Sequence, residues 1–146
     1  MDPETEQKIF KFETFVNEVL KADLASLAER LDAKNDAITE FLQLKSVVTT
    51  FQNTDIEKTG FKTKLDIGNS FFIQAHVPDA STILLNVGLG HYVEFTLEEA
   101  LVVIDVRIKL LEKQIVNLRK AVAKTNAHIK LILLVIRDIK GMKEDV

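Results

Sequence analysis

Histidines are the residues of this sequence that could most readily bind a metal or transfer a proton, and there are only three. His76 and His91 fall in predicted strands and could approach each other, while His128 lies far from both. Isolated histidines of this kind are by default surface or interface residues. There is no cysteine, which excludes thiolate metal sites and disulfides, and no Ser/His/Asp arrangement is expected to assemble. We therefore predict no catalytic residue, no metal and no cofactor.

The Gly88-Leu89-Gly90 pair could suggest a phosphate-binding loop. It lacks a third glycine, and no strand-to-helix switch follows it directly, so a hairpin turn is the favoured interpretation.

Charge and hydropathy narrow the function classes further. The formal net charge of −3 gives no basic surface for nucleic acid. The most apolar run, residues 131–136, is far shorter than the roughly 20 residues of a membrane helix. The first residues, Met1-Asp2-Pro3-Glu4, do not resemble a secretion signal. We expect one intracellular domain over residues 1–146 that binds neither nucleic acid nor membrane.

The elements around these residues follow two helical heptad patterns. In residues 97–140, aliphatic side chains recur at alternating steps of four and three, with Thr96 and Glu99 as a capping box at the start. The positions are Leu97, Leu101, Ile104, Ile108, Leu111, Ile115, Leu118, Val122, Thr125, Ile129, Ile132, Ile136 and Ile139. Such a helix would be about 65 Å long and needs a partner along its length.

Residues 3–53 supply that partner. Their heptad pattern runs from Leu20 to Gln52, and Ile9, Phe12 and Val16 continue it with a register shift near Leu20. Lys34, Lys45 and Thr125 interrupt the two patterns, either because they set the pairing of the helices or because the coil frays there. Residues 53–60 are predicted to form a loop.

Residues 61–95 alternate as strands, with turns at residues 68–70 and 88–90. The predicted fold is therefore mainly α within the α+β class: two long helices form an antiparallel coiled coil and are joined by two β-hairpins. Helices that point away as a rod cannot cover four short strands. We therefore expect the hairpins to oligomerise.

The order of these elements resembles that of α-type prefoldin subunits. Residues 85–96 (LNVGLGHYVEFT) resemble the second hairpin of that family, and residues 71–79 (FFIQAHVPD) resemble the end of its first. Residues 12–24, 41–45 and 66–72 are similar to one prefoldin-like branch of α subunits.

The resemblance implies a non-catalytic subunit of a prefoldin or prefoldin-like hexamer, with β-type subunits and another α-type subunit as partners. In this family the coiled-coil tips hold unfolded or assembling proteins without ATP. The alternative is an adaptor or transcriptional cofactor that binds one native partner, such as a transcription factor, through the coil. The branch also implies a location in cytoplasm and nucleus.

Two groups of residues are candidates for these contacts. Candidate tip residues for clients or partners are Phe10, Phe12, Phe15, Ile136, Ile139 and Met142. For Phe12, Ile136 and Ile139, closing the coiled-coil seam is the favoured interpretation. Candidate oligomerisation residues in the hairpins are Phe71, Ile73, Leu85, Val87, Val93 and Phe95. For these, subunit contact is favoured over a core formed within one chain.

Overall fold

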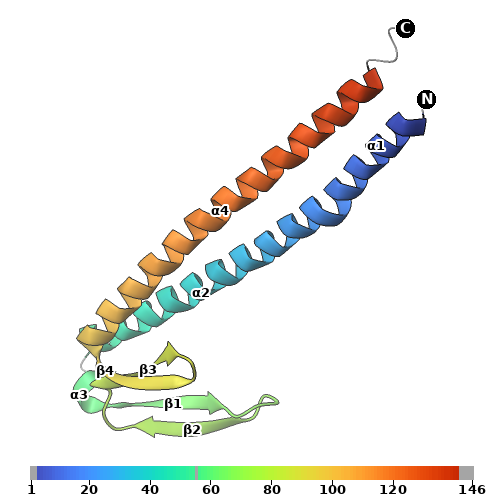
Figure 1. Cartoon of the computed structure of the whole chain (residues 1–146). Helices are drawn as coiled ribbons and strands as arrows, with labels where there is room; N and C mark the ends of the chain where they lie inside the picture. The colour runs from blue at the N-terminus through green and yellow to red at the C-terminus, as the bar shows by residue number, and fades with distance from the viewer. Residues whose placement is uncertain (1–2, 55, 142–146) are drawn as a thin grey trace. The chain divides into compact units, whose positions relative to one another are not determined.

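The computed structural model describes residues 3–54 and 56–141 of the chain. It is mainly helical, with two small antiparallel hairpins between two long helical segments (Figure 1), which confirms the predicted fold class. The elements are α1 (Pro3–Thr14), the π-helix η1 (Phe15–Leu20), α2 (Lys21–Asn53), α3 (Ile56–Thr59), β1 (Phe61–Asp66), β2 (Phe72–Val77), β3 (Thr82–Gly88), β4 (His91–Thr96) and α4 (Leu97–Gly141). They form a helical unit, residues 3–37 with 111–141, and a hairpin unit, residues 38–110 without residue 55.

In the helical unit, the residues that share the predicted heptad pattern are the ones removed from solvent. Its buried side chains are Ile9, Val16, Leu20, Ile115, Leu118 and Ile136. The Lys140 ammonium donates to Glu13 Oε1 at 3.1 Å, so the last turn of α4 lies beside α1 and the two segments run antiparallel. Apolar burial along the seam, with an ion pair at its margin, is the arrangement of a two-stranded coiled coil.

The predicted register shift near Leu20 has a structural cause. Residues 15–20 form a π-helix rather than an α-helix. A π turn holds one extra residue, so two successive steps of four, from Val16 to Leu20 and from Leu20 to Leu24, keep the stripe facing the partner helix. Val16 and Leu20 are both buried as a result.

In the hairpin unit, β1 pairs only with β2 and β3 pairs only with β4 among the described residues, both antiparallel. The registers bring Leu65 opposite Ile73 and Leu85 opposite Val93, with a β-bulge at residues 86–88. The capping box forms as predicted: the Thr96 N–H donates to Glu99 Oε2 at 3.0 Å, and the Glu99 N–H donates to Thr96 Oγ1 at 3.3 Å. The chain therefore passes directly from β4 into α4.

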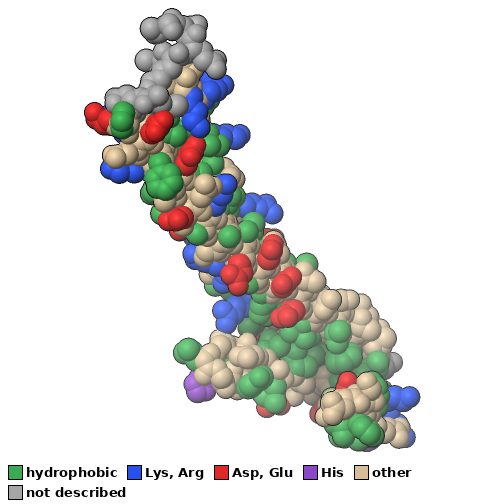
Figure 2. Space-filling model, turned by 90° about the vertical axis from the view of Figure 1, so that its right-hand side faces the viewer, with side chains coloured by type: hydrophobic (Ala, Val, Ile, Leu, Met, Phe, Trp, Pro, Cys, Tyr) green, Lys and Arg blue, Asp and Glu red, His purple; other side chains and the backbone are tan. Residues whose placement is uncertain are grey.

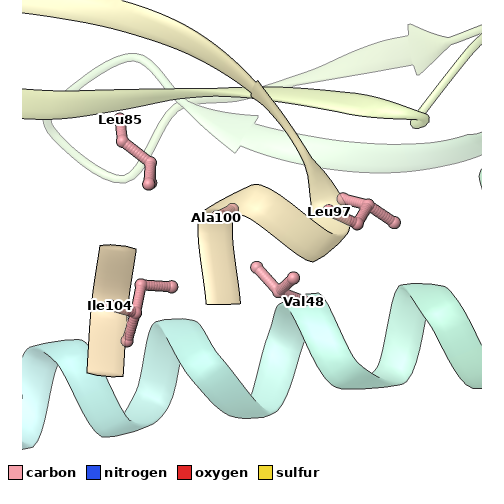
Figure 3. Packing of buried hydrophobic residues seen from close by; sticks show 5 residues of the cluster. All are labelled: Val48, Leu85, Leu97, Ala100 and Ile104. Atoms are coloured by element: carbon pink, nitrogen blue, oxygen red, sulfur yellow. The ribbon is translucent and has the colours of Figure 1, made fainter. Parts of the chain in front are cut away.

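The core of the hairpin unit joins one face of the second hairpin to the helices. Leu85 points from β3 towards α4, Val48 points from α2, and Ala100 and Ile104 are completely buried between them (Figure 3). The partly buried side chains packed around them are Phe41, Leu44, Phe51, Ile83, Phe95, Leu101, Val103 and Ile108.

This packing corrects one expectation. The helices do cover one face of β3–β4, so the prediction that they leave all four strands uncovered is wrong for this hairpin. Residues 53–60 also contain the short helix α3 instead of only a loop. Its single turn ends where the Gly60 N–H donates to the Ile56 carbonyl at 2.9 Å, and Gly60 then starts the turn into β1.

Gly60 is expected to be intolerant of any side chain. Its φ of +70° is left-handed, and an added Cβ would collide with the backbone carbonyls of Val77 and Pro78. We expect Gly60→Ala to destabilise the chain by several kcal/mol, because the backbone of the neighbouring strand would have to shift. Gly90→Ala is the matched control: φ is +77° there, but no atom lies within 4 Å of the added Cβ. It should cost only about 1–2 kcal/mol. Thermal unfolding measures both, and equal losses would contradict the steric argument.

Candidate interaction surfaces

The first candidate surface lies on α1 and η1, near the start of the chain. Phe10 is 69% exposed, Phe15 is 45% exposed and Phe12 lies at the margin of the seam with 36% exposed. The side chains of Phe10, Phe15 and Val19 line a shallow hollow of about 300 Å³, with Lys11 and Glu18 at its rim. We call this the tip surface. The π-helix contributes to it, because Phe15 and Val19 belong to the turn that absorbs the register shift.

The other predicted tip residues separate into two groups. Ile136 is buried and Ile139 is partly buried, so both lie in the seam, as favoured from the sequence. Met142 lies outside the described residues.

Four exposed side chains in the last turns of α4 were not among the predicted tip residues, namely Leu131, Leu133, Leu134 and Val135. The run at residues 131–136 was the available signal. It is apolar around the whole helix, so a partner on one side cannot cover it.

The second candidate surface is the first hairpin, β1–β2. Leu65 and Ile73 face each other on one side and remain 53% and 48% exposed, while Phe72 points to the opposite side and is 60% exposed. Ile67 and Phe71 at its turn end are also exposed. The hairpin is held to α2 at its other end, where the rings of Phe51 and Phe61 lie 5.1 Å apart between centroids. Figure 2 shows hydrophobic side chains reaching the surface of the hairpins and of the helices.

The six predicted oligomerisation residues therefore fall into different environments. Leu85 and Phe95 pack in the core of this chain, the alternative left open by the sequence, and Val87 is partly buried. Phe71, Ile73 and Val93 remain exposed and are free to contact another molecule.

Charged groups fasten the hairpin unit at two points. The Lys45 ammonium donates to Asp105 Oδ1 at 2.7 Å, so this interruption of the heptad pattern pairs α2 with α4. The Arg107 guanidinium donates to the Val87 carbonyl at 2.7 Å and ties α4 to the bulge of β3. Between the hairpins, the Ser81 N–H donates to Asp79 Oδ1 at 2.9 Å, and hydrogen bonds from the Ser81 backbone and side chain hold the pKa of that carboxyl below its ordinary value.

The histidines do not form a ligand cluster. His76 lies on β2 and His91 on β4, in different hairpins, and both are exposed. Among the side chains that the structure describes, no group of three His, Cys, Asp or Glu could hold a metal ion. In the same part of the chain, no helix is long and apolar enough to span a membrane.

Comparison with known proteins supports the same architecture. The family model described as "Prefoldin subunit" matches residues 20–138. The chain is 38% identical over 141 residues to "Protein UXT homolog" of Nematostella vectensis, covering 97% of this chain and 89% of that protein. It is 32% identical over 139 residues to "Protein UXT" of Homo sapiens, covering 95% and 87% of the two chains.

A solved structure agrees in fold. The cryo-EM structure of filamentous PFD from Methanocaldococcus jannaschii matches with a TM-score of 0.66 and 20% sequence identity, covering 80% of this chain and 94% of that one. The family match extends from the end of η1 almost to the end of α4 and includes both hairpins. This chain therefore belongs to the prefoldin family.

Proposed function

We propose that this chain is a non-catalytic subunit of a prefoldin or prefoldin-like hexamer, and that it holds unfolded or assembling proteins at its helix ends without ATP. The exposed tip surface is the observation that carries the proposal. Phe10 and Phe15 there leave about half or more of their side chains in water, although the seam beside them is closed. Exposed apolar groups of this kind commonly mark sites where a protein binds another protein.

The chemistry of the tip suits clients without a fixed shape. The hollow on α1 and η1 is shallow and offers rotatable aromatic side chains with one positive and one negative residue at the rim. The exposed leucines at the end of α4 add a second apolar patch on a helix. Adaptable apolar surfaces bind many sequences weakly, because each client can repack against them.

Assembly is the other half of the proposal. The exposed side chains of β1–β2 would be buried against β-type subunits and another α-type subunit. Native mass spectrometry of the tagged chain drawn from cells tests this directly, and a complex that contains several prefoldin subunits is the expected result. Recovery of the chain alone would overturn this half. We further propose that the complex occurs in cytoplasm and nucleus, which cell fractionation would measure.

The double substitution Phe10→Ser and Phe15→Ser tests client binding. Burying one such side chain contributes about 1.5–3 kcal/mol, so we expect the assembled complex to hold a chemically unfolded model protein at least about tenfold more weakly. Suppression of aggregation during dilution from denaturant measures the effect. Leu42→Ser, a change at a 52% exposed position on α2 away from the tip, is the control and should behave as the parent chain.

The same pair of variants separates the two candidate functions. Weaker binding of many different unfolded proteins by the double Phe variant would support the chaperone function. Unchanged binding of unfolded proteins, together with lost binding of one native partner such as a transcription factor, would support the adaptor function instead.

A further inference from the structure

A pocket in the hairpin unit lies outside both candidate surfaces. It has a volume of about 320 Å³ and is enclosed by α2, β3 and α4. Its walls are mainly apolar, formed by Phe41, Leu44, Leu85, Val87 and Val103. This volume is at the small end of the roughly 300–1,000 Å³ range of ligand pockets, so it suits one or two side chains better than a large cofactor.

The polar groups at the rim are mostly hydrogen-bond donors. Arg107 is partly buried and donates one N–H to the Val87 carbonyl. The other N–H groups of its guanidinium can therefore donate to a ligand. Among the ion pairs of the described residues, none includes Arg107. Asn86 accepts from the Gly88 N–H at 2.9 Å with its side-chain oxygen, so its amide NH₂ is available as a donor. Glu40 is the one carboxylate that lines the pocket.

We propose that this pocket binds a short peptide segment of a partner protein, in which a bulky apolar side chain is followed by an acidic residue. The apolar side chain fills the space between Phe41, Leu85 and Val103. The carboxylate accepts from the guanidinium of Arg107, and a neighbouring peptide carbonyl accepts from the Asn86 amide. Because the partly buried guanidinium of Arg107 has no ion-pair partner among the described residues, a negatively charged carboxylate is the group that complements it.

Short acetylated and amidated peptides provide the probes. The first carries the sequence Gly-Ser-Phe-Glu-Ser-Gly, the second replaces Glu by Gln, and the third replaces Phe by Ala. Binding is measured by chemical-shift changes in the full chain, followed by titration of the complex purified with its subunits. We expect the first peptide to bind best, with shifts at Leu85, Val103 and Arg107. The Gln peptide should bind up to about fivefold more weakly, and the Ala peptide at least about tenfold more weakly.

Two substitutions that should change the affinity of the first peptide in opposite directions test the role of charge at the rim of the pocket. Arg107→Gln should weaken the first peptide about fivefold, since it removes the cation. Glu40→Gln should strengthen the same peptide about twofold, since it removes a repelling carboxylate from the rim. Arg119→Gln, at an exposed position on the same helix, is the matched control and should change nothing. If Arg107 only held β3 in place through the Val87 carbonyl, Arg107→Gln would weaken the Glu and Gln peptides equally, whereas loss of the cation should weaken only the Glu peptide.

Three results would overturn the proposal. One is equal binding of the Glu and Gln peptides, which would remove the part assigned to Arg107. Another is the absence of shifts around the pocket. The third is binding to the free chain that disappears in the purified complex, because the pocket would then be covered by a neighbouring subunit. All three leave the tip surface and the assembly of the hexamer untouched, so they are independent of the function proposed above.

Discussion

Replacing Leu65 and Ile73 together by serine is expected to prevent this chain from joining other prefoldin subunits while leaving its own fold intact. The two side chains face each other across β1–β2, and about half of each is in water. Full burial of a Leu or Ile side chain contributes about 1.5–3 kcal/mol, and about half of that remains to be gained at each position, so the loss of both should weaken assembly at least about tenfold. Native mass spectrometry of the purified mixture would show free chain in place of the complex.

The control for this experiment must be at apolar positions that are at least as exposed. Val102→Ser and Val106→Ser on α4 meet that condition, since these side chains are 65% and 60% exposed in the same hairpin unit. We expect their complex to form normally. Dissociation with these variants, or normal assembly of the strand variant, would show that the subunits meet elsewhere.

The second large effect is expected at Ile104, whose side chain is completely removed from solvent. It packs against Val48, Leu85 and Ala100, so it joins α4 to both α2 and the second hairpin. Ile104→Ala leaves a cavity at this junction and should lower the free energy of unfolding by about 2–5 kcal/mol. Circular dichroism during heating would record a fall in melting temperature of about 2–4 °C for each kcal/mol lost.

Val106→Ala is the control for the core substitution, because it removes two methyl groups from the same helix at a solvent-facing position. It should change the stability by less than about 0.5 kcal/mol. A similar loss for both variants would mean that helix propensity, and not packing, decides the result. β-branched residues are mildly unfavourable in helices, so the small effect of Val106→Ala should be in the stabilising direction.

Much of the fold was predictable because a heptad pattern depends on sequence spacing alone. All thirteen predicted seam positions of α4, from Leu97 to Ile139, are buried or partly buried, including Thr125. The strand boundaries and turns followed from alternation and from glycines whose φ values are indeed positive, such as Gly68 and Gly88. These features are local, so they can be read from neighbouring residues.

The remaining features depend on contacts between distant residues. Alternation placed Leu85 and Phe95 on one face of a hairpin, but it could not show that the face rests on α2 and α4. The pairing of Lys45 with Asp105 joins residues that are 60 positions apart. The same limit applies to the candidate sites, since the pocket beside Arg107 is built from three elements and no local pattern marks it. Phe10, a candidate tip residue that falls off the heptad stripe, is exposed, whereas its role in binding stays a prediction.

The exposure of β1–β2 has a consequence for how cells could control the amount of this protein. An isolated two-stranded hairpin is marginally stable, and its turn at Asn69 and Ser70 holds two residues in the left-handed region. If a neighbouring subunit completes this sheet, the hairpin and the loop at its turn are exposed in an orphan chain and covered in an assembled one. Proteases and quality-control factors that act on that loop would remove only the surplus. The abundance of the chain would then follow the supply of its scarcest partner.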